Sequence, residues 1–210
     1  MNILFITDNF YPERNAPAKR TYEHVINWVS KNNQIEIITT VPNYPKGIIF
    51  NGYKNKLCQL ENIEGIKVKR VWSFIYPNKG FYLRIIDYIS FFFSSLIGGI
   101  FSKKPDVIIS TSPQLFSAIS GWMLSKIKRT PFVLEIRDLW PESIIALELI
   151  KNRILINILQ SITLKLYKDA KAIIVVSESI KEHIINLDIA SDKIHLIPNG
   201  ITVSNIKPNI

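Results

Sequence analysis

The stretch "PFVLEIRDLWPES", residues 131–143, joins an apolar run directly to a cluster of charged residues. Residues 132–136 are mostly branched, aromatic or long aliphatic, which is typical of a short strand buried in a sheet. Arg137, Asp138 and Glu142 follow at once. Charged groups at the end of a buried strand indicate a helix cap, a surface ion-pair cluster or a ligand site.

Apolar runs of the same kind recur along the chain and alternate with stretches whose apolar residues have helical spacing. The runs are residues 3–7, 35–40, 66–71, 106–110, 132–136, 172–176 and 194–197. The helical stretches are residues 16–32, 112–129, 153–170 and 177–187. This alternation predicts right-handed strand–helix–strand crossovers. We therefore expect an α/β fold with a doubly wound, mostly parallel, Rossmann-like sheet of about seven strands and helices on both faces.

Three local patterns refine this expectation. Residues 66–71 alternate between apolar and charged side chains, which predicts a strand near an edge of the sheet. Residues 41–64 have no clear period and are expected to form one long loop, a kind of segment that is often functional. Ser112 and Pro113 together are typical of a helix N-cap and first helical position, and Ser177 or Ser179, ahead of an acidic residue, is typical of a second N-cap.

The composition narrows the class of protein. Apolar residues make up 47% of the 210 residues, which is enough for a sizeable core and argues against disorder. The net charge of +9 either favours an anionic partner or reflects an ordinary solvated surface. Cys58 is the single cysteine, which fits a reducing compartment, and the first ten residues resemble a buried strand rather than a signal peptide. These features predict a cytoplasmic protein.

Several motifs that bind nucleotides, metals or nucleic acids are missing from the sequence. It contains no G-x-G-x-x-G, no Walker A motif, no D-x-D pair and no G-x-S-x-G. A dinucleotide site, a metal-held nucleotide diphosphate and a hydrolase of that type are therefore not indicated. The three histidines are scattered and predict no zinc site. Lys and Arg residues are not grouped with aromatic residues, so we expect no nucleic-acid partner.

Residues 81–101 form an unusually apolar stretch, with fifteen uncharged residues between Asp87 and Lys103. This length is shorter than the roughly 20 residues that a membrane span requires, and a core helix packed on the sheet would explain it. However, the stretch is apolar nearly all round, and the basic residues Lys79, Arg84, Lys103 and Lys104 flank it. The pattern also predicts a helix with one face in the core and another in a membrane interface.

Ligands of doubly wound sheets bind beyond the carboxyl ends of the strands. Four loops at such positions are rich in polar, proline and aromatic residues, namely residues 7–17, 41–47, 110–114 and 137–143. In the first loop, Lys19 and Arg20 could meet diphosphate oxygens, although a simple strand–helix connection is the alternative. Tyr44 and Tyr53 could stack on sugar faces, although an ordered surface loop would explain them equally well.

These segments resemble a known family. The segments that show the resemblance are "FYPERNAPAKRTYE", "PNYPKGIIFNGY", "ENIEGIKVKRV", "STSPQLFSAI", "EIRDLWPES", "VVSESIKEHI" and "IHLIPNG". Over essentially the whole chain they are similar to the N-terminal half of family 4 glycosyltransferases, which have the two-domain GT-B architecture. "DLWPES" and "YPKG…GY" resemble most closely the fucosaminyltransferase-like subgroup of O-antigen and capsule pathways.

The resemblance implies a role for each candidate residue. Asn15-Ala16-Pro17 replaces a Gly-Gly-rich loop that approaches donor phosphates in the wider family, and Pro17 removes one N–H donor. Arg137 replaces a histidine that family members place at the reaction centre, so it is expected to recognise phosphate or carboxylate, and Asp138 remains the candidate base. The candidate substrate-binding residues are Asn15, Ala16, Lys19, Arg20, Tyr44, Tyr53, Thr111, Ser112 and Arg137, and the candidate catalytic residue is Asp138.

The resemblance also implies domains, substrates and location. Residues 1–198 would form the acceptor-binding domain and residues 199–210 the start of the interdomain linker, while the donor domain with its E-x7-E motif is expected to be absent, leaving the chain inactive alone. The reaction would proceed with retention, without a required metal or cofactor, from a nucleotide-sugar to a polyprenyl-diphosphate-linked saccharide at the inner membrane face. A GT-B-fold sugar-nucleotide 2-epimerase half and a non-catalytic lipid-sugar binding module are the alternatives.

Overall fold

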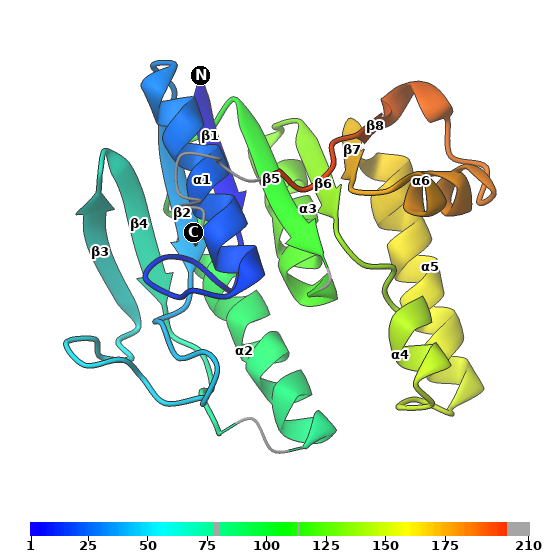
Figure 1. Cartoon of the computed structure of the whole chain (residues 1–210), viewed down its shortest axis with the longest axis horizontal. Coiled ribbons are helices and arrows are strands. Elements are labelled where there is room, and N and C mark those ends of the chain that lie inside the picture. The colour runs from blue at the N-terminus through cyan, green and yellow to red at the C-terminus, as the bar shows by residue number, and fades with distance from the viewer. Residues whose placement is uncertain (78–79, 113, 201–210) are drawn as a thin grey trace, which may run out of the picture.

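The computed structural model describes residues 1–77, 80–112 and 114–200 (Figure 1). The sheet contains strands β1 (Asn2–Ile6), β2 (Gln34–Thr39), β3 (Cys58–Ile63), β4 (Ile66–Val71), β5 (Val107–Ser112), β6 (Phe132–Ile136), β7 (Ala172–Val175) and β8 (Ile194–Leu196). The helices are α1 (Ala16–Ser30), α2 (Phe81–Ile100), α3 (Leu115–Lys128), α4 (Glu142–Ala146), α5 (Arg153–Asp169), α6 (Glu178–Ile185) and the short 3-10 helix η1 (Ser191–Lys193).

The strands form one sheet in the order β3-β4-β2-β1-β5-β6-β7-β8. Every neighbouring pair is parallel except β3 and β4, which are antiparallel. The chain winds outward from β1 in one direction through β2 and β4, and in the other through β5 to β8. The order therefore reverses between β1 and β5, where a ligand crevice is expected. The predicted doubly wound, mostly parallel sheet is confirmed.

The sheet has eight strands where about seven were expected, and the prediction of one irregular loop over residues 41–64 was wrong in one part. Residues Cys58–Ile63 form the eighth strand, β3, which pairs only with β4 at the edge of the sheet. Its side chains alternate between exposed and half-buried, and Leu60 is largely exposed, because no helix covers this edge. A strand without a buried face lacks the apolar periodicity that identified the others. Residues 66–71 lie next to this edge, as predicted.

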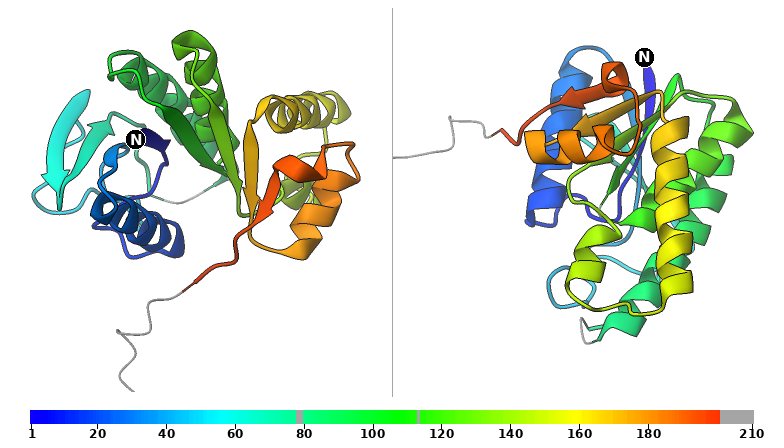
Figure 2. Two further views of the ribbon diagram at one scale, coloured as in Figure 1. Left: turned by 90° about the horizontal axis from the view of Figure 1, so that it is seen from above. Right: turned by 90° about the vertical axis from the view of Figure 1, so that its right-hand side faces the viewer.

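Helices cover both faces of the sheet (Figure 2). α1 and α6 lie on one face, and α2, α3 and α5 lie on the other. On the α1 face, Val25 packs with Phe5 and Ile37 of the two central strands. On the opposite face, Phe91 of α2 and Leu124 of α3 belong to a second core cluster. Both faces of the central strands are thus buried, which explains their nearly continuous apolar character.

The starts of two helices were predicted, and the structure agrees with the prediction for α6 but not for α3. Asn15 caps α1, because its side-chain oxygen accepts a hydrogen bond from the Ala18 N–H at 3.0 Å. Ser177 caps α6 in the same way. The predicted helix start at Ser112 was wrong: Ser112 pairs with Ile136 in the β5–β6 ladder, and α3 begins only at Leu115. The sheet ladder thus prevails over the local capping signal. The predicted role of Pro113 lies outside the described residues.

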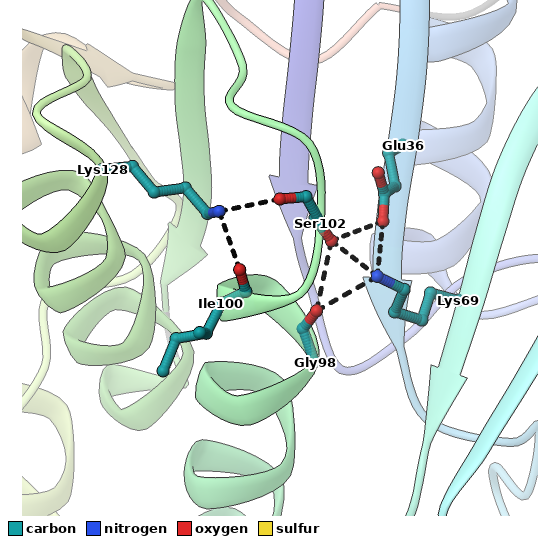
Figure 3. A network of polar contacts seen from close by, with 6 residues as sticks. All are labelled: Glu36, Lys69, Gly98, Ile100, Ser102 and Lys128. Atoms are coloured by element: carbon teal, nitrogen blue, oxygen red, sulfur yellow. Dashed lines mark hydrogen bonds and ion pairs between the residues drawn. The ribbon is translucent and has the colours of Figure 1, made fainter.

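A network of polar contacts fixes the carboxyl end of α2 to the sheet (Figure 3). The Lys69 ammonium lies 2.8 Å from the Glu36 carboxylate and donates to the Ser102 hydroxyl at 2.6 Å and to the Gly98 carbonyl at 3.1 Å. Lys128 donates to the Ser102 carbonyl at 2.8 Å. Lysines at a helix carboxyl end satisfy free carbonyl groups and favour the helix dipole. The network therefore holds α2 in one orientation.

Candidate functional site

The four predicted loops follow β1, β2, β5 and β6, and so they share the carboxyl edge of the sheet. The first loop is anchored to the end of β2, because the hydroxyls of Thr39 and Thr40 donate to the Asp8 carbonyl at 3.2 and 3.0 Å. Within the loop, Asn15 donates to the Asn9 side chain at 2.6 Å. Asn15 is therefore occupied by the loop and by the helix cap, whereas the neighbouring Ala16 is exposed.

Glu13 connects the first loop to the second. One of its carboxylate oxygens accepts hydrogen bonds from the backbone N–H groups of Asn43 and Tyr44, at 2.8 and 2.9 Å. The other oxygen has no hydrogen-bond partner among the described residues, although Glu13 is almost fully buried. Burial raises the pKa of Glu13, while these two hydrogen bonds oppose the rise. Glu13 thereby holds Tyr44, whose side chain is exposed, at the carboxyl edge.

Arg70 is fully buried and supports Tyr53. Its guanidinium donates to the carbonyls of Thr40 and Tyr11, at 2.9 and 2.6 Å, and forms an ion pair with Glu61. The same guanidinium lies 4.9 Å from the centre of the Tyr53 ring. One face of this ring is therefore occupied by a cation–π contact. A sugar that stacks on Tyr53 would therefore have to use the opposite face of the ring.

A buried charge cluster joins α1, β6 and the end of the described chain. Arg137 forms an ion pair with Glu135 and donates to the Asn199 side chain at 2.8 Å. The side chains of Glu135 and Arg137 are only 4% and 6% exposed. His24 lies 3.9 Å from the same carboxylate. Arg20 is the fourth member of the cluster, because its pKa responds to the charges of both Glu135 and Arg137.

This cluster has more positive than negative charge and contains unsatisfied atoms. The Nε groups of Arg20 and Arg137 and one oxygen of Glu135 have no hydrogen-bond partner among the described residues. Burial lowers the pKa of Arg20 and of His24, and the Glu135 carboxylate opposes both changes. Two guanidinium groups facing one carboxylate can accommodate a further anion. Predicted residues Arg20 and Arg137 are thus brought together.

Lys19 lies apart from this cluster. Its side chain is 56% exposed and lies 3.8 Å from Glu23, one turn further along α1. A surface pair of this kind contributes little to stability. The structure therefore separates Lys19 from Arg20, although the two are adjacent in the sequence.

The remaining predicted residues follow β5 and β6. Thr111 and Ser112 are buried at the carboxyl end of β5, and the Ser117 hydroxyl donates to the Thr111 carbonyl at 2.7 Å. Asp138 is exposed and forms no hydrogen bond or ion pair with the part of the chain that the structure describes. A free carboxylate at this edge can accept a proton from a hydroxyl group.

Two acidic residues that sequence reasoning did not select also belong to this edge. Burial raises the pKa of Asp87, on α2, to about 7, with further contributions from the charges of Asp8 and Glu13. Burial also raises the pKa of Asp8. The signal in the sequence was Asp87 itself, an acidic residue within a long apolar helix. With a pKa near 7, Asp87 can donate or accept a hydrogen bond at neutral pH.

No metal centre is found at this edge. Among residues 1–77, 80–112 and 114–200, no three His, Cys, Asp or Glu side chains are arranged to hold a metal ion.

The helix α2 exposes an apolar stripe on its outer side. The stripe comprises Ile86, Ile89, Phe93, Ile97 and Ile100, and we call it the α2 stripe. Phe93 and Ile97 are each 56% exposed, whereas Phe91 and Ser95 on the inner side are fully buried. By length and composition alone, Leu83–Ile100 could cross a membrane, with a mean hydropathy of 1.4. The packing of its inner side on the sheet and α3 instead favours a helix that lies along an apolar surface. Lys79, one of the predicted flanking residues, lies outside the described residues.

Comparisons with known proteins agree with this architecture. Residues 17–205 match the family model described as Glycosyltransferase Family 4. No curated protein sequence matches the chain significantly. Among solved structures, sucrose-phosphate synthase from Thermosynechococcus elongatus has a TM-score of 0.59 at 12% identity, covering 97% of this chain and 49% of that chain.

Two further structures have similar scores. HepE from Anabaena, in complex with UDP and glucose, has a TM-score of 0.56 at 13% identity, covering 97% of this chain and 46% of its own. UDP-GlcNAc 2-epimerase from Methanocaldococcus jannaschii has a TM-score of 0.52 at 13% identity, covering 95% of this chain and 46% of its own. The chain thus spans about half the length of the solved structures that it matches.

Proposed function

This chain belongs to glycosyltransferase family 4, and from that premise we propose that it is the acceptor-binding half of a retaining glycosyltransferase. The complete enzyme would move a sugar from a nucleotide-sugar to a polyprenyl-diphosphate-linked saccharide in surface polysaccharide synthesis, on the inner face of the cell membrane. The sugar would be an N-acetylamino sugar such as N-acetylfucosamine, as in the fucosaminyltransferase-like subgroup of O-antigen and capsule pathways. The chain would be inactive alone.

One observation carries this proposal: α2 connects a polar edge to an apolar surface. The pKa of Asp87, on α2, responds to the charge of Asp8 in the first loop, while the side chains of the α2 stripe are exposed. A lipid-linked saccharide has the same two chemistries in one molecule. Its sugar requires hydroxyl-binding groups, and its polyprenyl chain requires an apolar layer.

The candidate residues would divide the work between the sugar and the diphosphate. Arg20 and Arg137 would bind diphosphate oxygens, because their cluster has surplus positive charge and free N–H groups. Tyr44 and the free face of Tyr53 would stack on sugar rings. Asp138 would accept the proton of the attacking hydroxyl, which agrees with its exposure at the edge. Asn15, Ala16, Thr111 and Ser112 would shape the floor of the same crevice.

The donor would be bound mainly by a second domain, reached through a linker that begins at Asn199. The likeness to HepE supports a nucleotide-sugar donor, since that protein was seen with UDP and glucose. We propose that no metal or further cofactor is required. Residues 201–210 of the proposed linker lie outside the described residues.

A binding experiment with the purified chain tests the acceptor role. We expect it to bind vesicles that contain a polyprenyl-diphosphate-linked N-acetylamino sugar more tightly than vesicles with the corresponding polyprenol, and to show no turnover of a UDP-sugar. Equal binding to both kinds of vesicle would overturn the acceptor role. Turnover by the chain alone would overturn its assignment as half of an enzyme.

The likeness to UDP-GlcNAc 2-epimerase gives a second candidate function, half of a GT-B-fold sugar-nucleotide epimerase. That enzyme class acts on soluble substrates and has no use for the α2 stripe. It therefore predicts binding of UDP-sugars without vesicle binding. A non-catalytic lipid-sugar module would instead bind the acceptor, yet give no transfer when a donor domain is added.

A further inference from the structure

A second apolar surface lies outside α2, where α4 ends and α5 begins. It comprises Leu147, Leu149, Ile154, Leu155 and Ile158, and we call it the α4–α5 patch. Leu147 and Ile154 are 70% and 72% exposed. The inner side of α5 is already buried through Leu159 and Leu166, so these side chains are not needed for packing α5 on the domain. Large apolar side chains grouped in this way mark an interaction surface.

α5, which carries most of the α4–α5 patch, shares one face of the sheet with α2. α2 and α5 both cover the sheet face opposite α1, with α3 between them (Figure 2). α4, the start of α5 and the first turns of α2 lie at the same end of the domain in Figures 1 and 2. This end is also where the parallel strands finish and the candidate site begins. One extended surface could therefore touch both groups at once.

The charges around the two groups favour an anionic surface. The exposed residues Lys151 and Arg153 lie within the α4–α5 segment, and Arg84 is exposed on the first turns of α2. Glu148 is the only acidic residue between Leu147 and Ile158, all of which the structure describes, and it pairs with Lys151 at 3.0 Å. A second copy of this chain would bring the same net charge of +9, and this repulsion disfavours self-association. Basic residues beside apolar ones instead match anionic lipid headgroups.

We propose that the α4–α5 patch is a second membrane contact, which acts with the α2 stripe on one anionic lipid surface. This inference rests on the proposed membrane contact of α2, and it adds a second contact that sets the orientation of the domain on the membrane. Two separate contacts fix the tilt of the domain, whereas a single helix would allow it to roll. The carboxyl edge would then be held close to the headgroups, where the diphosphate of a lipid-linked saccharide lies.

Vesicle sedimentation with paired variants tests this inference. The probe is the 210-residue chain with vesicles of phosphatidylcholine and phosphatidylglycerol in equal amounts, at low salt. The patch variant carries Leu147→Ser and Ile154→Ser, and the stripe variant carries Phe93→Ser and Ile97→Ser. We expect each pair to lower the partition coefficient at least tenfold. Lys151→Gln with Arg153→Gln should lower it roughly fivefold for each residue, and this effect should disappear at high salt.

A matched control removes equally exposed leucines elsewhere. Leu57 and Leu60, which are 84% and 71% exposed, lie next to and within the edge strand β3. The variant with Leu57→Ser and Leu60→Ser should bind within twofold of the wild type. If the patch variant also binds within twofold while the stripe variant fails, the inference is wrong and the proposed function stands. If the wild type does not bind, the proposed membrane contact itself is wrong.

Fluorescence then reports both contacts in one bound orientation. With Cys58→Ser as background, an environment-sensitive dye is attached through Ile154→Cys, Ile97→Cys or, as control, Leu60→Cys. Emission should shift to the blue on vesicle binding at the first two positions and stay unchanged at the third. A shift only at position 97 would overturn the inference. A lipid-free dimer that the patch variant dissociates would also overturn it, in favour of a second copy as the occupant.

Discussion

Asp87 is the residue whose environment differs most from what its sequence neighbours suggest. Its pKa is raised to about 7 from 3.8, first by burial and then by Asp8 and Glu13. Between these two values the unfolded chain has released this proton and the folded chain has not. The unfolded state then binds fewer protons, so this group lowers the free energy of unfolding as pH rises from about 4 to about 7.

The first prediction concerns Asp87→Asn. Each unit of pKa shift corresponds to about 1.4 kcal/mol, and after a reduction for partial solvent screening we expect the variant to be about 2 kcal/mol more stable at pH 8. Near pH 3 the two proteins should have similar stability, because Asp87 is then largely protonated in both states. Urea unfolding at both pH values measures the difference. An equal stabilisation at both would show that burial of the charge is not its cause.

Arg20 carries the second prediction, together with its neighbour Lys19. Arg20→Gln removes the surplus guanidinium of the buried cluster and should weaken binding of inorganic pyrophosphate about tenfold. Lys19→Gln removes the same charge from an exposed side chain paired with Glu23 and should weaken it less than about twofold. Calorimetry at constant ionic strength measures both. Equal losses would mean that general charge, rather than the cluster, attracts the anion.

At the scale of elements, α2 combines an apolar outer side with a polar anchor at its carboxyl end. The anchor depends on Lys69, whose side chain is 10% exposed and whose partner Glu36 is 23% exposed. Lys69→Met would leave the Glu36 carboxylate and the Gly98 carbonyl without this donor. Removing one partner of a largely buried ion pair lowers the free energy of unfolding more than replacing both partners does.

The third prediction is therefore that Lys69→Met lowers the free energy of unfolding by about 2–3 kcal/mol. The double variant Lys69→Met with Glu36→Gln should recover about half of this loss. Chemical denaturation measures both, and amide exchange should accelerate in the last turns of α2. Unchanged exchange there would show that the network does not hold the helix.

Some of the strands and helices could be predicted from the sequence, and others could not. Central strands such as β1 and β5 were predictable because both faces are buried, which gives a continuous apolar run. β3 was missed because an uncovered edge strand needs no apolar face. The start of α3 was misplaced because the ladder with β6 extends through Ser112. In both β3 and the start of α3, pairing between strands that are distant in the sequence determines the structure. A local sequence pattern does not indicate such pairing.

The same limit applies to the candidate site. Its loops were predictable, since strand ends meet at one edge of a parallel sheet. Their interactions were not, because Glu13 bonds to Asn43, and Asp87 comes within electrostatic range of Asp8, only after folding. Adjacent residues Lys19 and Arg20 looked equivalent in the sequence, yet the helix turns one outward and the other toward Glu135. The roles assigned to these residues stay predictions.

At the scale of the whole molecule, the chain spans about half the length of the solved structures that it matches. In a two-domain transferase, the reacting groups meet only when both halves enclose the substrates and exclude water. Arg137 donates to Asn199 at the start of the proposed linker, so the buried cluster is connected to the segment that would lead to the second half. The position of that half would therefore influence the diphosphate site.

The last prediction follows from this dependence. We expect that the chain, when joined to a family 4 donor domain, transfers an N-acetylamino sugar to a polyprenyl-diphosphate-linked acceptor, and that neither half does so alone. Asp138→Asn should then lower kcat about 100-fold or more, because the attacking hydroxyl loses its base. Thermal unfolding should stay unchanged, since Asp138 is exposed and has no polar partner among the described residues. Rates from single-turnover assays on vesicles separate chemistry from binding. An unchanged kcat would remove Asp138 from the mechanism, and the other carboxyls of the edge, Asp8 and Asp87, would become the candidates for the base.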